Sequence, residues 1–165
     1  IVEAMQSLLP EKVQWVVLGS GDKDMEQQLL ALAQQAPKQV AVIIGYDEAL
    51  AHRIEASSDL FVMPSRYEPC GLNQIYSLRY GTLPVVRATG GLADTVVDGV
   101  SGFVYVGDSA DDLEQCLRRA ISYFSKSKTW EKFQRAAMSQ CFDWQQSAQQ
   151  YLALYRASPA HHSPG

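Results

Sequence analysis

The sequence has few cysteines and no cluster of residues that could ligate a metal. Its three cysteines, Cys70, Cys116 and Cys141, are widely spaced, and neither a Cys-x-x-Cys pair nor a Cys/His cluster occurs. This pattern excludes a disulfide framework and a structural zinc site, and it favours reduced thiols in a reducing cytoplasm. His161 and His162 are adjacent, but they stand in a Ser/Pro/Gly-rich tail, which indicates a solvated end rather than a metal site.

An excess of basic residues and long hydrophobic runs are also lacking. Lys plus Arg number 14 against 18 for Asp plus Glu, which gives a net charge of -4. A mildly acidic chain without a basic run is a poor candidate for binding nucleic acid or an anionic membrane. No apolar stretch approaches the ~20 residues needed to span a bilayer. We recognise no secretory signal, because the chain opens with Ile1–Ala4 inside an expected helix. The absence of an initiator Met suggests a piece of a longer protein.

There is enough apolar material for one sizeable core. Hydrophobic residues make up 47% of the 165 residues and charged residues 19%. This composition excludes a disordered or low-complexity chain and fits one domain of ordinary size. We expect residues 1–156 to form that domain and residues 157–165 to be a disordered tail or a remnant of expression.

Short β-branched runs alternate with longer helical stretches along the chain. The expected strands are Val13–Leu18, Val40–Ile44, Asp59–Met63, Leu83–Val86 and Phe103–Val106. The expected helices are Asp24–Gln35 with Asp24 as its cap, Glu48–Ala56, Leu72–Tyr80, Leu92–Val97, Asp111–Phe124, Thr129–Met138 and Asp143–Arg156. Continuously apolar strands joined by helices predict an α/β fold, a doubly wound, Rossmann-like parallel sheet with helices on both faces. We expect Trp15 to lie in the core, and Trp130 and Trp144 to anchor the late helices.

Four loops containing glycine follow strands. They are Gly19–Gly21, Gly45-Tyr46, Pro64–Gly71 and Thr89–Gly91. Ligands of doubly wound sheets bind beyond the carboxyl ends of the strands, and all four loops fall at such ends. The sequence therefore predicts a binding site along this edge.

The loop Pro64–Gly71 is the strongest candidate. The N–H groups at the start of the following helix lack intrahelical partners, and they suit sugar hydroxyls or a phosphate. These groups belong to Cys70, Gly71, Leu72 and Asn73. Pro69 restricts Glu68 to an extended backbone, so Glu68 would be a fixed acceptor beside them. The alternative is that Arg66 and Glu68 form an ion pair at the base of the loop.

The other loops carry less specific patterns. Gly90 and Gly91 precede a short helix and would let a ligand approach the backbone, although a plain turn has the same pattern. Gly19-Ser20-Gly21 lacks the third glycine and the downstream acid of a dinucleotide fingerprint, so NAD or FAD binding is not supported. Tyr46 either stacks on a nucleobase or packs within the fold.

These motifs resemble those of a known family. The run Pro64–Leu72, then Gln74, Tyr76–Arg87 and Thr89–Val96, is similar to the bacterial glycogen synthases and plant starch synthases. Leu18–Asp22, Gly45-Tyr46 and Phe142–Gln145 also resemble that family. The resemblance covers nearly the whole chain apart from the tail, and its roughly thirty matched positions in one region are more specific than any single motif.

The resemblance implies a two-domain GT-B transferase that moves glucose from ADP-glucose to the non-reducing end of an α-1,4-glucan, with retention. No metal or other cofactor is expected, and the location would be a bacterial cytoplasm, with a plastid left open. This chain would be most of the C-terminal, donor-binding domain. The family's first strand, its Arg–Lys pair and the N-terminal acceptor domain with its Lys-x-Gly-Gly-Leu motif would precede Ile1.

The resemblance also implies a role for each candidate residue. Glu68 would lie beside the donor glucose as the catalytic-site acid, and Tyr46 would stack on the adenine. The backbone of Cys70, Gly71 and Leu72 would contact the glucose hydroxyls, and Asn73 would contact the distal phosphate. Gly90 and Gly91 would also contact the donor sugar and phosphate. Gly19 and Ser20 would contact the nucleotide. Tyr76 stands where related retaining transferases often have a second Glu, which glycogen and starch synthases commonly lack too. Asn73 stands where many members have Thr.

Without the Arg–Lys pair, the chain lacks the cations that would stabilise the departing ADP, so we expect it to fold without elongating glucan.

Two other functions stay open. One is a retaining GT-B transferase that uses UDP-glucose or a related donor, since donor choice depends on the pocket around Tyr46. The other is a non-catalytic nucleotide-sugar- or glucan-binding module. The intact loop at Glu68 favours an enzyme over the module.

Overall fold

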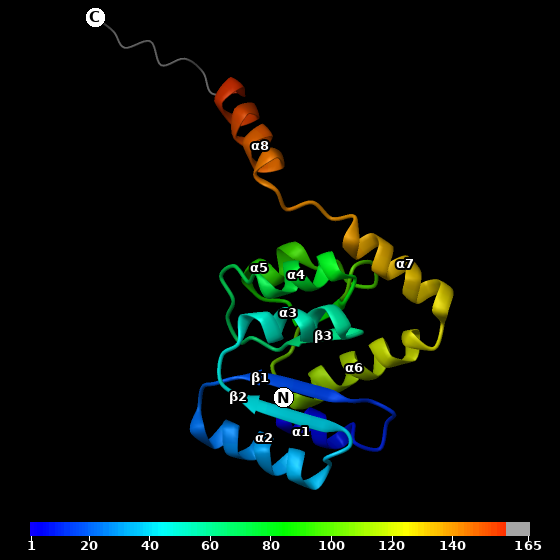
Figure 1. Ribbon diagram of the computed structural model, residues 1–165. Coiled ribbons are helices and arrows are strands. Elements are labelled where there is room, and N and C mark those ends of the chain that lie inside the picture. The colour runs from blue at the N-terminus through cyan, green and yellow to red at the C-terminus, as the bar shows by residue number, and fades with distance from the viewer. Residues whose placement is uncertain (158–165) are drawn as a thin grey trace, which may run out of the picture.

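The computed structural model describes residues 1–157 (Figure 1). Its strands are β1 (Trp15–Gly19), β2 (Val40–Ile44), β3 (Leu60–Met63), β4 (Leu83–Arg87) and β5 (Phe103–Tyr105). Its helices are α1 (Val2–Ser7), α2 (Lys23–Gln35), α3 (Glu48–Ser57), α4 (Asn73–Tyr80), α5 (Gly90–Thr95), α6 (Ala110–Phe124), α7 (Ser127–Met138) and α8 (Trp144–Ala157). The predicted tail from residue 158 on, including His161 and His162, lies outside the described residues.

The five strands lie in two separate parallel sheets. β1 pairs with β2 in one sheet, and β3, β4 and β5 form the other in that order. Strands and helices alternate as expected, so the predicted α/β class with parallel strands is confirmed. The strands do not form one continuous sheet, however, because β1 and β3 are not hydrogen-bonded to each other.

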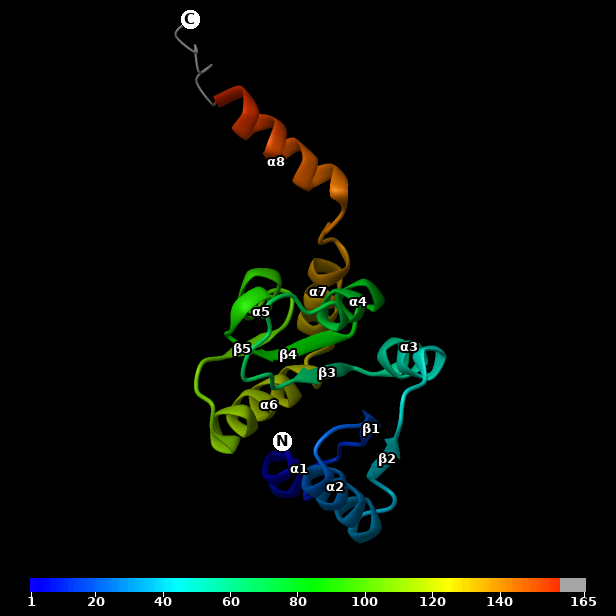
Figure 2. The same cartoon turned by 90° about the vertical axis from the view of Figure 1, so that its left-hand side faces the viewer.

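Helices cover the strands in two layers. α1 contacts both α2 and α6, and these three helices form one layer. α3 contacts α4, and α4 contacts α5, so these three helices form the other layer. Figure 2 shows β3 and β4 between α6 of the first layer and α4 of the second. Residues Leu83–Val86 of β4 are thereby buried on both faces, which is the usual arrangement of a parallel strand, whereas Ile43 and Ile44 of β2 remain exposed.

Each sheet has its own hydrophobic core. The larger one joins β4 and β5 to α6 and α7, and it includes Leu83, Phe103, Leu117 and Trp130. The smaller one packs α1 and α2 against β1 and β2. Trp130 is 6% exposed, so its predicted anchoring role is confirmed. Trp15 is half-buried and packs against both cores.

Capping side chains set the starts of three helices. Asp22 accepts a hydrogen bond from the Met25 N–H at 3.0 Å and caps α2, so the prediction that Asp24 caps this helix is wrong. Asp47 caps α3 in the same way through the Leu50 N–H. Ser109 begins α6 with a reciprocal capping box. Such side chains satisfy N–H groups that have no partner in the first turn.

α8 extends away from the rest of the molecule. Figures 1 and 2 both place it beyond α7, and it makes no extended contact with any other helix or strand that the structure describes. Trp144 is 87% exposed, so the prediction that it anchors this helix is wrong. Tyr151, Leu154 and Tyr155 are exposed as well. The apolar pattern of α8 has no partner surface among residues 1–157.

Candidate sugar-nucleotide site

The start of α4 presents a row of unbonded backbone N–H groups. Within residues 1–157, the N–H groups of Cys70, Gly71, Leu72 and Asn73 donate to no other group. Leu72 stands at the N-cap position without a side-chain cap, and Cys70 is exposed. The predicted row of free N–H groups is therefore present, and the positive end of the α4 dipole lies beside it.

Glu68 lies beside this row and is half-buried. Its backbone carbonyl accepts a hydrogen bond from the Gly91 N–H at 3.0 Å. The structure records no ion pair between Arg66 and Glu68 among the described residues, so the ion-pair alternative is not supported. The side chain of Glu68 is left available at the loop.

The two glycines at the start of α5 pack against the loop that carries Glu68. Gly90 has a φ of 46°, and a Cβ built on it would overlap the carbonyl oxygen of Glu68. A Cβ on Gly91 would lie 3.1 Å from the Cα of Cys70. The Gly91 N–H is already bonded, so it is not free for a ligand. Close approach of two loops explains why both positions lack a side chain.

A buried glutamine joins these loops, which the sequence analysis did not predict. Gln74 is fully buried in the first turn of α4. Its Nε2 donates to the Gly71 carbonyl at 2.6 Å and to the Thr95 hydroxyl at 3.2 Å, and that hydroxyl donates to the Gly91 carbonyl at 2.7 Å. This chain of bonds fixes the loop before α4 against α5. No local pattern in the sequence marks these partners, because they are about twenty residues apart.

The other candidate loops follow β1 and β2. The Gly45 N–H donates to the Gly19 carbonyl at 3.0 Å and ties the two strand ends together. Tyr46 comes next and is 87% exposed, so it is not packed within the fold. Ser20 is exposed too. These residues therefore lie at the carboxyl ends of a different sheet from the loop that carries Glu68.

A carboxylate fixes the loop after β1. Glu26 of α2 accepts hydrogen bonds from the Lys23 ammonium at 2.8 Å and from the Gly21 N–H at 2.9 Å. These two bonds, the lysine first, hold the pKa of the Glu26 carboxyl below its ordinary value. Glu26 thus fixes the loop after Gly19 at Gly21, while Ser20 remains exposed to solvent.

The cationic side chains near the Glu68 loop are Arg66 and Arg87. Arg66 is exposed, and its carbonyl accepts a hydrogen bond from Arg87 Nη1 at 2.9 Å. The Nε of Arg87 is buried and has no hydrogen-bond partner among the described residues. Tyr76, where related transferases often have a second Glu, has its ring 5.4 Å from that of His52.

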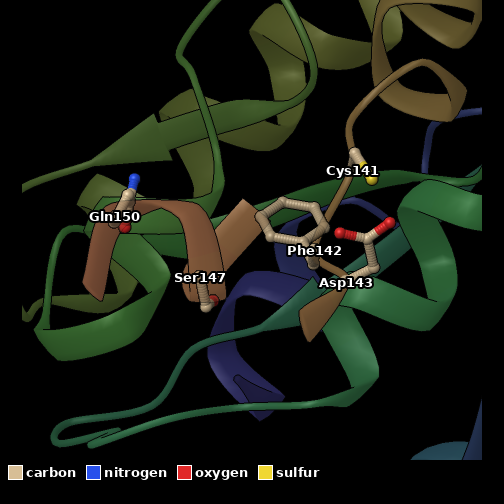
Figure 3. A pocket seen from close by; sticks show the side chains of 5 residues that line it. All are labelled: Cys141, Phe142, Asp143, Ser147 and Gln150. Carbon is tan, nitrogen blue, oxygen red and sulfur yellow. The ribbon is translucent and has the colours of Figure 1, made fainter. Parts of the chain in front are cut away.

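One hollow lies away from this loop cluster, and a larger cleft reaches it. The shallow hollow of about 290 Å³ is lined by Cys141, Phe142, Asp143, Ser147 and Gln150 where the chain enters α8 (Figure 3), and none of these is a candidate site residue. The larger cleft of about 910 Å³ separates β1 from β3 and reaches Asn73. Residues 1–157 contain no group of three or more His, Cys, Asp or Glu side chains placed to hold a metal. No helix among them is long and apolar enough to cross a membrane.

The fold is that of the GT-B architecture of glycosyltransferases. The family model for glycosyl transferases group 1 matches residues 1–137, and the chain belongs to that family. It corresponds to the C-terminal domain of that architecture. The C-terminal domain of a group 1 family protein from Francisella tularensis shares the fold, at 19% identity with a TM-score of 0.68, over 83% of this chain and 73% of that one.

The more similar relatives are glycogen and starch synthases, which confirms the resemblance seen in the sequence. A glycogen synthase from Dechloromonas aromatica is 52% identical over 158 residues, covering 90% of this chain and 33% of the relative. One from Hydrogenovibrio crunogenus is 47% identical over 167 residues, covering 95% and 34%. The catalytic domain of starch synthase IV from Arabidopsis thaliana, bound to ADP and acarbose, is 35% identical with a TM-score of 0.82, over 93% of this chain and 34% of that one. The chain thus spans about a third of the length of these relatives.

Proposed function

We propose that this chain is the donor-binding part of a glycogen or starch synthase, which transfers glucose from ADP-glucose to an α-1,4-glucan with retention. The observation that carries the proposal is the row of unbonded N–H groups from Cys70 to Asn73, with Glu68 held beside it. Such a row binds the oxygens of a sugar or a diphosphate without any change in backbone conformation. The ADP bound in the related starch synthase IV supports an adenine nucleotide.

Each candidate residue has a role in this proposal. Glu68 holds the donor glucose, and the backbone at Cys70, Gly71 and Leu72 binds its hydroxyls. Asn73 binds the distal phosphate, Tyr46 stacks on the adenine, and Gly19 and Ser20 line the nucleotide. Gly90 and Gly91 act through the Glu68 loop, which they hold in place, and Gly90 also lies near the sugar–phosphate group. The reaction needs no metal or other cofactor, the acceptor glucan binds to a second domain, and the protein acts in a bacterial cytoplasm.

A direct test is donor binding and transfer by the longer polypeptide that contains this chain. Calorimetry measures the affinity for ADP-glucose and for UDP-glucose and so distinguishes the two donors. A structural neighbour, HepE from Anabaena, binds UDP-glucose. We expect preference for ADP-glucose. Comparable or tighter binding of UDP-glucose would contradict the proposed donor, and binding of either without transfer to glycogen would support a non-catalytic module.

Two substitutions test the residue roles. Glu68→Gln should lower the transfer rate by a factor of about 100 or more, because the charged acceptor beside the sugar is lost. Tyr46→Ala should weaken nucleotide binding by about 1–3 kcal/mol, the usual loss when an aromatic ring no longer stacks on a base. Tyr155→Ala is the matched control, because Tyr155 is 73% exposed on α8. If Tyr46→Ala binds like the control, the stacking role is wrong.

A further inference from the structure

Two carbonyl groups hold the loop that carries Glu68 against its surroundings. The Glu68 carbonyl accepts a hydrogen bond from the Gly91 N–H at 3.0 Å, and the Gly71 carbonyl accepts one from Gln74 Nε2 at 2.6 Å. The first bond joins two backbone groups, whereas the second depends on a side chain. A substitution of Gln74 therefore changes the support of the loop at Gly71 while every backbone group stays in the protein.

The bond from Gln74 determines the direction of the Leu72 N–H. The Gly71 carbonyl and the Leu72 N–H belong to one peptide group, which is trans, so the two point in opposite directions. Because Gln74 holds the carbonyl, the Leu72 N–H points away from the Gln74 side chain. Within residues 1–157 this N–H donates to no other group, and Leu72 is exposed. The N–H is thus available to a ligand.

The next N–H of the row, that of Asn73, needs no such support. It shares a peptide group with the Leu72 carbonyl, which accepts the first hydrogen bond of α4, from the Tyr76 N–H at 3.0 Å. The helix itself therefore sets the direction of the Asn73 N–H. Of these two neighbouring N–H groups, only that of Leu72 has its direction set by the side chain of Gln74.

The surroundings of the Gln74 amide determine which of its atoms faces Gly71. A backbone carbonyl can only accept, so the amide atom 2.6 Å from it is the nitrogen. The other hydrogen of that nitrogen is donated to the Thr95 hydroxyl at 3.2 Å, and this hydroxyl donates to the Gly91 carbonyl at 2.7 Å. Both N–H donors of the amide are therefore used, and Thr95 holds the amide in place.

Packing alone would not favour glutamine at position 74. The side chain is fully buried, although glutamine is mostly exposed in proteins, and its Oε1 has no hydrogen-bond partner among the described residues. A buried acceptor without a partner is unfavourable. The unbranched side chain of methionine has a similar length and fills such a space without an unbonded oxygen. What the amide of Gln74 contributes beyond packing is its bond to the Gly71 carbonyl.

We propose that Gln74 is a positioning residue for donor binding, which directs the Leu72 N–H toward a hydroxyl of the donor sugar by holding the Gly71 carbonyl. Thr95 supports this role because it holds the Gln74 amide. The inference rests on the proposed function, in which the backbone at Leu72 binds the glucose. Gln74 itself does not touch the donor, because its side chain is fully buried. ADP without glucose does not use this N–H, so its affinity is independent of Gln74.

Gln74→Met in the longer polypeptide tests this role by calorimetry with ADP-glucose and with ADP. We expect the affinity for ADP-glucose to fall ~10-fold, since a sugar hydroxyl loses its directed donor, and the affinity for ADP to stay within ~2-fold. Gln134→Met is the matched control, because Gln134 Nε2 donates to the Gly81 carbonyl at 3.0 Å, at the other end of α4. Equal losses for both ligands, or no loss for ADP-glucose, would overturn the proposal.

Substitutions at Thr95 test the same role from α5 and serve also if Gln74→Met does not fold. Thr95→Val removes the hydroxyl that holds the amide, so it should weaken ADP-glucose binding ~3-fold and leave ADP binding unchanged. Thr95→Ser keeps the hydroxyl and should bind both ligands like the wild type. In the double variant Gln74→Met/Thr95→Val the two losses should not add, because both act on one bond. Binding by Thr95→Ser as weak as by Thr95→Val would contradict the role of the hydroxyl.

A measurement without donor distinguishes failure of this inference from failure of the proposed function. If the wild-type longer polypeptide binds neither ADP-glucose nor UDP-glucose, the proposed function is wrong. Crystal structures of the wild type and of Gln74→Met compare the Gly71–Leu72 peptide group directly. We expect this group to rotate in the variant, while the bond between the Glu68 carbonyl and the Gly91 N–H is kept. An unchanged orientation of the peptide group would overturn the positioning role, whatever the protein binds.

Discussion

At the scale of single residues, the candidate site depends on contacts that leave no room for a side chain. Gly90 has a positive φ, and the Glu68 carbonyl lies where its Cβ would be. Gly99 has a similar φ of 66°, but a Cβ there would meet open space. Substitutions at these two glycines therefore distinguish the free-energy cost of backbone strain from the cost of a clash with the Glu68 loop.

We predict that Gly90→Ala is more harmful than Gly99→Ala. Both substitutions strain the backbone by about 1 kcal/mol or more, because alanine disfavours positive φ. Only Gly90→Ala must also displace the Glu68 carbonyl, so it should lose a further ~1–2 kcal/mol of folding free energy. Urea unfolding of both variants measures the difference. Equal losses in the two variants would show that the contact with the Glu68 loop is unimportant.

An ion pair outside the site makes a pH-dependent contribution to stability. Asp98 accepts hydrogen bonds from two nitrogens of Arg119, at 2.6 and 2.8 Å, and from the Val104 N–H at 2.7 Å. The Arg119 guanidinium, more than the other contacts, holds the pKa of the Asp98 carboxyl below its ordinary value. A lowered pKa in the folded state means that the stabilisation is present above the unfolded pKa and is lost as the pH falls through the folded one.

We therefore predict that Asp98→Asn loses stability at pH 7 and that this loss becomes smaller as the pH falls through the lowered pKa of the native Asp98 carboxyl. The loss at pH 7 should be about 1 kcal/mol or less, because the pair is half-exposed and screened by solvent. Unfolding in urea at several pH values measures it. Asp94→Asn is the control, since Asp94 is exposed and the structure records no ion pair for it. A pH-independent loss in Asp98→Asn would contradict this account.

At the scale of elements, the late helices differ although their sequences are alike in pattern. α7 buries Trp130, Phe133 and Ala137 against the larger core. α8 exposes Trp144 and Tyr155 and makes no extended contact with the other described elements. An amphipathic pattern indicates a helix, but it does not specify which surface the apolar side covers.

We predict that deleting residues 144–165 leaves the melting temperature of the remaining chain within about 2 °C of its original value, since little buried area is lost. Trp130→Ala, in contrast, should cost about 3–5 kcal/mol, because it opens a cavity in the larger core. Differential scanning calorimetry compares the two. A large drop on deletion of α8 would mean that this helix packs against the body in solution.

At the scale of the whole molecule, residues 1–157 present a divided sheet and one wall of a site. The Glu68 loop and the Tyr46 loop follow strands of different sheets, and the cleft separates those sheets. Of the cations near the Glu68 loop, Arg87 is bonded to the Arg66 carbonyl. The α4 dipole alone contributes only about 0.3–2 kcal/mol toward an anion. In the proposed function, these groups fall short of what stabilising a departing diphosphate requires.

We predict that the 165-residue chain alone transfers glucose to glycogen at less than about a thousandth of the rate of the longer polypeptide, a difference of roughly 4 kcal/mol in transition-state stabilisation. Incorporation of labelled glucose from ADP-glucose into glycogen measures both proteins side by side. Similar rates would refute the prediction and would show that the donor-binding part is sufficient for catalysis.

The sequence by itself determined the order of strands and helices and the edge on which the candidate site lies. Continuous apolar runs such as Leu83–Val86 specify buried parallel strands, and glycine-containing loops after them fall at the carboxyl ends. The free N–H groups of Leu72 and Asn73 were predictable too, because every helix start leaves such groups unbonded, whereas those of Cys70 and Gly71 lie in the loop before the N-cap residue. All of these features depend on residues that are close in the sequence.

Only the tertiary structure decided which segments meet. It placed Gly90 against Glu68 and Gln74 against Thr95, left Trp144 exposed, and divided the strands between two sheets. The cap of α2 was misassigned between two nearby aspartates because both can accept the same kind of bond, and only the backbone path selects Asp22. Contacts between distant segments depend on packing and crossover geometry, which local hydrophobic period and capping preference do not encode.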